Sequence, residues 1–371
     1  MLGLSPGTHT VRHAEKCMKQ REKKREKAKS PSTKLRRLLL KQERATNQGA
    51  NEALEGDTYQ SGIGHEETVN VEKIPDSIPR GNFKSAKFHG KPTIISFDLE
   101  TTGLIQGGVL PQITQISAVE VVSEQQFNTY VNPTVPIDKT ATSVTGIAYF
   151  EGQMTVNGTK VQSVNIRSAV DDMIAWISKF QNVCLVAHNG RRFDFPILVT
   201  TLTNLGVFDK FSKCAFIDSL SVFRKLYPKQ SLKQVDLVST ILGEVYDAHN
   251  AIEDVKALGK LIQHVNLPTK DLMEHSFSPS AVANNIMFNK AKASNLPSLN
   301  PLIYTGVMKR PTAENIAGSG LNLSHLKLLY SRGGEDALRD VFTAKNSEGL
   351  PRVTNVKKLL DEIIPKMSMF F

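Results

Sequence analysis

Cysteine is scarce in this 371-residue sequence. It occurs only at Cys17, Cys184 and Cys214, and no two of these have the spacing of a zinc site. So small and odd a number excludes a disulfide framework or a zinc ribbon as the main source of stability. We therefore expect a protein of a reducing, intracellular compartment.

Long apolar runs are also lacking. No stretch approaches the roughly 18 to 20 apolar residues that cross a bilayer. The first residues lack the charged start and apolar centre of a signal peptide. We expect no membrane association and no secretion. Apolar residues still make up 40% of the chain, which is enough for a sizeable core.

Charge is distributed unevenly along the chain. The net charge is +10, and residues 1–44 hold fourteen Lys or Arg against four Glu, so the remaining residues balance. Large apolar side chains are few up to residue 90, and we predict a disordered basic tail and linker over 1–90. The tail fits a solvated charged segment, nuclear import or a salt-sensitive contact with nucleic acid, and it predicts a nuclear or cytoplasmic location.

Residues 91–265 alternate between strand and helix patterns, which predicts an α/β domain. Short connections between the first three strands favour an antiparallel meander. The expected strands are Thr93–Phe97, Gln112–Val122, Gln126–Val131, Val183–Ala187 and Phe216–Leu220, and helices are expected after Ile166, over Leu232–Leu242 and over Asp247–Leu258.

Residues 266–371 have a different pattern, which predicts a small C-terminal helical region. Pro279 and the Pro297–Pro301 stretch are expected to interrupt it. Gly333 and Gly334 should separate the first two of three helices, which are expected over Leu323–Tyr330, Glu335–Phe342 and Thr354–Lys366.

The first strand ends in two carboxylates, Asp98 and Glu100, followed by Thr-Thr-Gly. Alternation along a strand places both side chains on one face. Two like charges so close repel, and one takes up a proton unless a cation such as Mg²⁺ or Mn²⁺ compensates them. Taken alone, the pair could equally be a solvated strand end.

Further polar candidates follow in two later segments. Asp194 precedes a helical run after the fourth strand, His249 stands at the leading edge of a late helix, and Asp254 lies about one turn into it. Each could instead have no role in chemistry: Asp194 could serve only as a helix N-cap, and His249 could be a solvated histidine.

Together these segments resemble the DEDDh group of 3′→5′ exonucleases. Phe97-Asp-Leu-Glu-Thr-Thr-Gly-Leu104 is similar to that family's first motif, Ala187-His-Asn-Gly-Arg-Arg-Phe-Asp194 to its second and His249-Asn-Ala-Ile-Glu-Asp254 to its third. The second motif looks most like the three-prime repair exonucleases and the exonuclease-like domain of promyelocytic leukaemia protein. The resemblance covers residues 91–265 and implies an RNase H-like fold, a mixed five-stranded sheet flanked by helices.

The resemblance also implies roles for individual residues. Asp98, Glu100, Asp194 and Asp254 would hold two Mg²⁺ (or Mn²⁺) ions, and His249 would be the general base. Thr101, Leu104 and Phe193 would contact the terminal nucleotide, although these side chains could equally be core. Arg191 departs from the pattern, because repair exonucleases often have an acidic residue there.

The implied activity is removal of nucleoside 5′-monophosphates from nucleic-acid 3′ ends, with single-stranded DNA as the expected substrate. An RNA 3′ exonuclease is an alternative, since no residue decides tolerance of the 2′-hydroxyl. A second alternative is an inactive fold that binds nucleic acid or protein. Retention of all five polar residues argues against it, because a cluster of buried carboxylates without a cation is costly. Pairing of two copies through an edge strand would give a homodimer.

Overall fold

The computed structural model describes residues 73–86 and 90–371. The predicted basic tail, and the linker up to residue 72, lie outside the described residues. The described residues belong to one compact unit.

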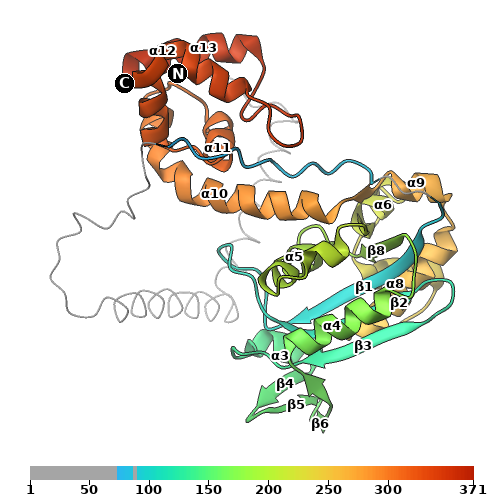
Figure 1. The fold of residues 1–371 in the computed structure, drawn as a ribbon. Helices are drawn as coiled ribbons and strands as arrows, with labels where there is room; N and C mark the ends of the chain where they lie inside the picture. The colour runs from blue at the N-terminus through green and yellow to red at the C-terminus, as the bar shows by residue number, and fades with distance from the viewer. Residues whose placement is uncertain (1–72, 87–89) are drawn as a thin grey trace, which may run out of the picture. The chain divides into compact units, whose positions relative to one another are not determined.

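A seven-stranded mixed sheet is the central layer of the α/β part of the chain (Figure 1). The five predicted strands make up its middle, and two strands of two residues each extend its edges. The order is β10 (Ser276–Phe277), β9 (Ala215–Asp218), β8 (Val183–Ala187), β1 (Thr93–Thr101), β2 (Ile113–Glu120), β3 (Gln126–Val131) and β7 (Ser163–Val164). The predicted α/β fold with a mixed sheet is therefore confirmed.

The pairing within the sheet follows the connections between strands. β1, β2 and β3 form the predicted antiparallel meander. β8 runs parallel to both β1 and β9, because helical crossovers join these strands. The carboxyl ends of β1, β8 and β9 consequently meet at one edge, where Asp98 and Glu100 lie.

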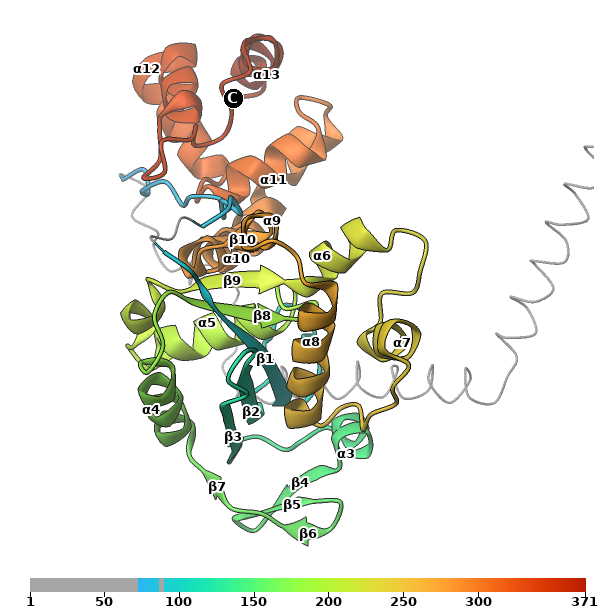
Figure 2. The ribbon, with the colours of Figure 1, turned by 90° about the vertical axis from the view of Figure 1, so that its right-hand side faces the viewer.

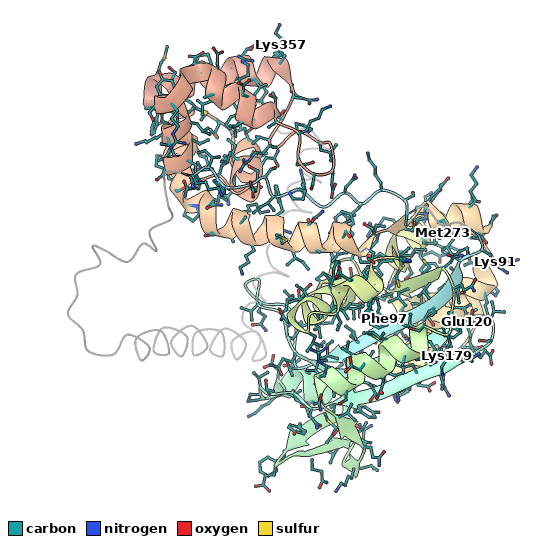
Figure 3. The ribbon with its side chains drawn as sticks, in the orientation of Figure 1. Lys91, Phe97, Glu120, Lys179, Met273 and Lys357 are labelled. Atoms are coloured by element: carbon teal, nitrogen blue, oxygen red, sulfur yellow. The ribbon has the colours of Figure 1, made fainter. Side chains whose placement is uncertain are left out.

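Helices cover both faces of the sheet. Figure 2 shows α4 (Ile166–Ile177) and α5 (Asp194–Asn204) on one face and α8 (Ala251–Val265) on the other. Phe97 belongs to the core beneath α4 and α5, where its ring lies parallel to that of Phe195 at 6.5 Å (Figure 3). Burying one such side chain stabilises the fold by about 1.5–3 kcal/mol. Asp98 and Glu100, one residue out of phase, therefore project toward the α8 side.

Several shorter elements complete this part of the chain. The predicted helix over Leu232–Leu242 is a short α-helix continued by a π-helical turn, and the late helix begins at Ala251 rather than at Asp247. The shorter elements are α3 (Lys139–Thr145), β4 (Ile147–Phe150), β5 (Gln153–Val156), β6 (Thr159–Lys160), a 3₁₀ turn (Phe208–Phe211), α6 (Ser219–Leu226), α7 (Gln234–Leu237), the π-helical turn (Val238–Leu242) and α9 (Thr269–Met273).

The C-terminal region is helical, as predicted, but one break was predicted wrongly. α10 runs unbroken over Pro279–Tyr304 with Pro297 and Pro301 inside it. Leu299 and Leu302 anchor this stretch in a second core, and that burial outweighs the lost hydrogen bonds. Pro279 occupies the first helical turn, where no bond is lost.

The remaining helices are α11 (Arg310–Gly318), α12 (Leu323–Thr343) and α13 (Lys357–Phe370). α12 covers two predicted helices and is kinked at the predicted place, since Gly333 and Gly334 have non-helical backbone angles. Of the described helices, none is long and apolar enough for a bilayer.

Two predicted boundaries differ from the packing. Residues 73–86 were expected to be linker, yet Ile74 packs against the C-terminal core and Phe83 against the sheet core. Beyond the expected boundary at residue 265, β10 pairs with β9, and Phe277 and Val282 are buried in the sheet core. The apolar side chains on both sides of the predicted domain thus complete its core.

Candidate metal centre

Asp98 and Glu100 lie near the end of β1, separated by Leu99, with their side chains on the same face. Opposite them on β2 lie Ser117 and Gln115, and the register shifts between Glu100 and Thr101. Such a bulge ends regular pairing and redirects the chain. The first motif therefore ends the strand at the point where its carboxylates are needed.

The first turn of α8 brings Asp254 to the same place. One carboxylate oxygen from each of Asp98, Glu100 and Asp254 lies within 4.8 Å of the others. Mg²⁺ and Mn²⁺ prefer such oxygen ligands, and opposite ligands in an Mg²⁺ octahedron lie about 4 Å apart. The donor set and its spacing fit a divalent cation.

Asp194 lies beside this group but is not one of the three. It is the first residue of α5, it is 2% exposed, and its Oδ1 accepts a 3.2 Å hydrogen bond from the Leu99 amide. The N-cap is Phe193, so the bland N-cap interpretation of Asp194 is wrong. The positive end of the helix dipole nevertheless favours a carboxylate here.

The turn that carries Asp194 is tightly packed. A side chain on Gly190 would place its Cβ 2.6 Å from Cβ of Ala187 and 2.7 Å from the ring of Phe195. Asn189 adopts a positive φ of 61°. Glycine in the second motif thus lets the turn fold directly onto the strand end, which fixes where α5 starts.

Burial and mutual repulsion shift the protonation of the cluster. Burial, together with the charges of Asp254 and Asp194, raises the pKa of Glu100 to about 8. Burial raises the pKa of Asp194 to about 7 against the opposing effect of its amide hydrogen bonds. The pKa of Asp98 is raised by burial and then by Asp194, Glu100 and Asp254. Without a cation the cluster therefore retains protons near neutral pH.

Asp254 is held by groups that the sequence did not reveal. Its Oδ1 accepts a 2.8 Å hydrogen bond from the Tyr246 hydroxyl and a 3.3 Å bond from Nε2 of Gln234. Its Oδ2 accepts a 2.8 Å bond from the main-chain amide of His249. Burial raises the pKa of Asp254, and the Tyr246 bond opposes that rise. The carboxylate is thereby oriented toward Asp98 and Glu100.

The structure places His249 next to the cluster, in the loop before α8. The residue is exposed and has a positive φ of 68°. Histidine is enriched among the few residue types that adopt this conformation. The charge of its ring lowers the pKa of Asp254, whose carboxylate its amide contacts directly. Its role as a base stays a prediction.

The three expected substrate contacts have different surroundings. Leu104 is 71% exposed, in the turn after β1. Thr101 is buried, and its hydroxyl donates a 2.7 Å hydrogen bond to the Gly103 carbonyl. Phe193 packs against the sheet core. Of the three, Leu104 is the side chain that projects most into solvent.

Comparison with known proteins adds two family matches. The model described as "Exonuclease" matches residues 95–262. This match confirms the predicted resemblance to exonucleases. A second model, "PML, C-terminal domain", matches residues 295–369, where no resemblance was expected.

Individual relatives are similar over the same region. Three-prime repair exonuclease 1 of Bos taurus is 32% identical over 202 residues, covering 46% of this chain and 62% of the relative. Exonuclease DPD1 of Arabidopsis thaliana is 27% identical over 261 residues, covering 60% and 76%. DNA polymerase III PolC-type of Caldanaerobacter subterraneus is 28% identical over 197 residues, covering 51% and 12%. The chain thus spans about three fifths of the bovine relative.

Among solved structures, E. coli exonuclease I in complex with a dT13 oligonucleotide is similar with 20% identity and a TM-score of 0.40, covering 49% of this chain and 42% of that one. The exonuclease-like region, residues 95–262, contains the three clustered carboxylates, Asp194 and His249. Phe83, α10 and the helices after it lie outside that match.

Proposed function

We propose that this protein is a metal-dependent exonuclease that removes nucleoside 5′-monophosphates from the 3′ ends of nucleic acid, preferentially single-stranded DNA. The observation that carries the proposal is the convergence of Asp98, Glu100 and Asp254 from separate segments. The names of the bovine and bacterial relatives support the 3′ polarity and the choice of DNA.

We assign each of the predicted site residues a role in hydrolysis. Asp98, Glu100 and Asp254 would hold Mg²⁺ or Mn²⁺, and Asp194 would help to hold a second ion. Bound cations supply the positive charge that stabilises the attacking and leaving oxygens of a phosphodiester. His249 would take a proton from the attacking water, since its exposed imidazole stands next to the carboxylate cluster and histidine is the commonest general base. Leu104 would contact the terminal base.

Labelled oligonucleotides test this function. Single-stranded DNA labelled at its 3′ end should release labelled mononucleotide at once in Mg²⁺, while the same strand labelled at its 5′ end should give a descending ladder. EDTA should stop both reactions. Asp98→Asn should lower the rate by roughly 10³-fold, because it removes a charged ligand shared by the cluster. The control is Asp172→Asn on the exposed side of α4.

The same assay decides between the alternatives. Faster release from RNA of the same sequence would make the protein an RNA exonuclease. Absence of metal-dependent mononucleotide release from either polymer would refute the enzymatic proposal and leave a binding module.

A further inference from the structure

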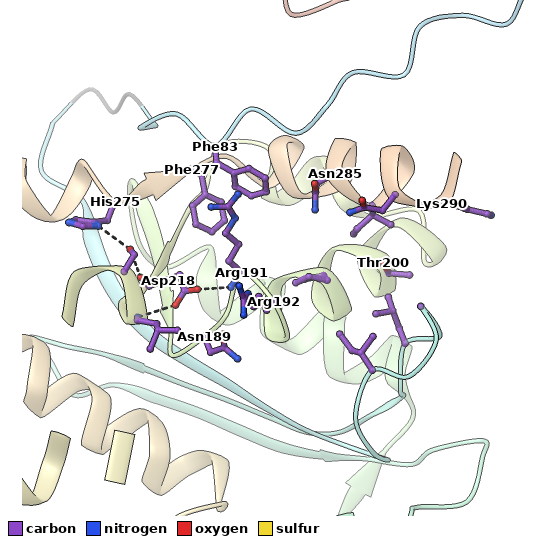
Figure 4. A pocket seen from close by; sticks show the side chains of 18 of the residues that line it. Phe83, Asn189, Arg191, Arg192, Thr200, Asp218, His275, Phe277, Asn285 and Lys290 are labelled. Atoms are coloured by element: carbon purple, nitrogen blue, oxygen red, sulfur yellow. Dashed lines mark hydrogen bonds between the residues drawn. The ribbon is translucent and has the colours of Figure 1, made fainter. Parts of the chain in front are cut away.

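A groove lies on the side of the sheet covered by α5 and is closed by α10 (Figure 4). Its volume is about 1170 Å³. Sites for small ligands typically measure about 300–1,000 Å³, so this groove is large for one small molecule. We call it the α10 groove and define it by Arg191, Arg192, Arg224, Asn285 and Lys290 together with the loop at 105–110.

Its charge is predominantly positive. Arg191, Arg192, Arg224 and Lys290 line it, against two carboxylates. Asp218 accepts hydrogen bonds from the amides of Leu220 and Arg191, and Glu274 pairs with Lys225 at 3.5 Å. Both acids are thus engaged with neighbours. The groove therefore suits an anion with several separated charges.

One of these arginines is fixed by a segment outside the exonuclease-like region. The guanidinium of Arg191 stacks 3.6 Å from the ring centroid of Phe83, and that ring packs edge-on against Phe277 at 5.2 Å. Stacking occupies the face of the guanidinium and leaves its N–H groups, at the edge, available to donate. Arg191 is therefore held ready for phosphate oxygens.

One wall of the groove is the turn that leads into Asp194. Asn189, Arg191 and Arg192 come from this turn, five to two residues before Asp194. The loop after Leu104 forms another wall, where Gly107 and Gly108 have positive φ and open space around them. Ile105, the residue after Leu104, lines the groove. A strand whose 3′ end contacts Leu104 could therefore continue into the groove.

We infer that the α10 groove binds the phosphates of the nucleic-acid strand at nucleotides inward from the 3′ end. This inference rests on the proposed function for the direction of the strand. Lys290 and Asn285 come from α10, which lies beyond the exonuclease-like region. The exonuclease-like region alone would therefore lack part of this subsite. The amides of Asn285 and Asn289 add neutral donors to the cationic wall.

Charge reversal on α10 provides the test. Lys290→Glu changes a groove residue, and Lys292→Glu is a matched control on the same helix that does not line the groove. Two residues along a helix point about 200° apart. Binding of the full-length protein to a fluorescent trinucleotide and to a single strand of about fifteen nucleotides is measured by anisotropy in EDTA.

Lys290→Glu should weaken binding of the longer strand at least about fivefold and the trinucleotide less than twofold. The salt slope for the longer strand should fall by about 0.7 for each lost phosphate contact. Lys292→Glu should leave both affinities within about twofold. Equal effects of the two variants, or equal effects on the two lengths, would overturn the inference. Displacement of the strand by an acidic peptide of equal charge would also overturn it.

Affinity in EDTA does not depend on cleavage, so the two proposals fail separately. Length-dependent loss of affinity in a protein that releases no mononucleotide would refute the exonuclease and retain the groove. Normal cleavage by the protein, together with unchanged affinity in Lys290→Glu, would refute the groove and retain the exonuclease.

Discussion

The hydroxyl of Tyr246 donates a 2.8 Å hydrogen bond to Oδ1 of Asp254. Partners of this kind orient a ligand group, and their removal typically costs about 10- to 100-fold in metal affinity or activity. Tyr246→Phe should therefore raise the Mg²⁺ concentration for half-maximal rate by about tenfold, with a smaller change in the rate at saturation. The control is Tyr304→Phe, at a residue that is 83% exposed. An unchanged Mg²⁺ dependence would contradict an orienting role.

His249→Ala should separate catalysis from metal binding. The imidazole is lost, but the bond to Asp254 comes from the main chain and remains. We expect the rate at saturating Mg²⁺ to fall by about 10²–10⁴-fold, as for loss of a general base, with little change in the Mg²⁺ requirement. His264→Ala, on an exposed position of α8, is the matched variant. A parallel loss of metal affinity would show that His249 acts through the cluster instead.

The metal-free protein should lose stability as pH rises. The pKa of Glu100 is raised by burial to about 8 and that of Asp194 to about 7, above their unfolded values of about 4. The folded state therefore binds more protons than the unfolded state between about pH 4 and 8, and the free energy of unfolding falls through that window.

Thermal unfolding in EDTA should accordingly give a lower Tm at pH 8 than at pH 6, and Mg²⁺ should raise Tm most at pH 8. Asp98→Asn should reduce the pH dependence in EDTA, because one of the repelling carboxylates is gone. A Tm that rises between pH 6 and 8 in EDTA would contradict this assignment of protons.

The kink in α12 gives a prediction about stability alone. Gly334 has φ 60° and ψ −145°, a conformation that is essentially restricted to glycine. Gly334→Ala should cost about 1–3 kcal/mol in the free energy of unfolding, measured by chemical denaturation. Its Cβ would meet open space, so strain and not a clash is the cause. Nucleotide release should be unaffected at temperatures where the variant is folded.

The sequence could predict the parts of the site that follow from local periodicity. Alternation along β1 placed Asp98 and Glu100 together, and the resemblance to the exonuclease motifs added Asp254. Gln234 and Tyr246 escaped because their bonds to Asp254 depend on how α7 and the following loop pack. No short pattern encodes that packing.

Two other features had a signal that was overlooked or overridden. The β4–β6 sheet turns at Glu151-Gly152 and Asn157-Gly158, which have paired positive φ values, and Asn-Gly is a strong hairpin signal. In α10 the proline signal was present but tertiary burial of Leu299 and Leu302 prevailed. Local preference decides structure only where packing leaves it free.

The short stretch 73–86 packs against both the sheet core and the C-terminal core. Ile74 enters the C-terminal core, Phe83 enters the sheet core, and the amide of Ala86 donates a 2.9 Å hydrogen bond to Ser276. A recombinant fragment trimmed to 91–265 would uncover the apolar surface that Phe83 and Phe277 now seal. The exonuclease-like region therefore depends on its neighbours, and transplanting it into another protein requires the flanking sequence on both sides.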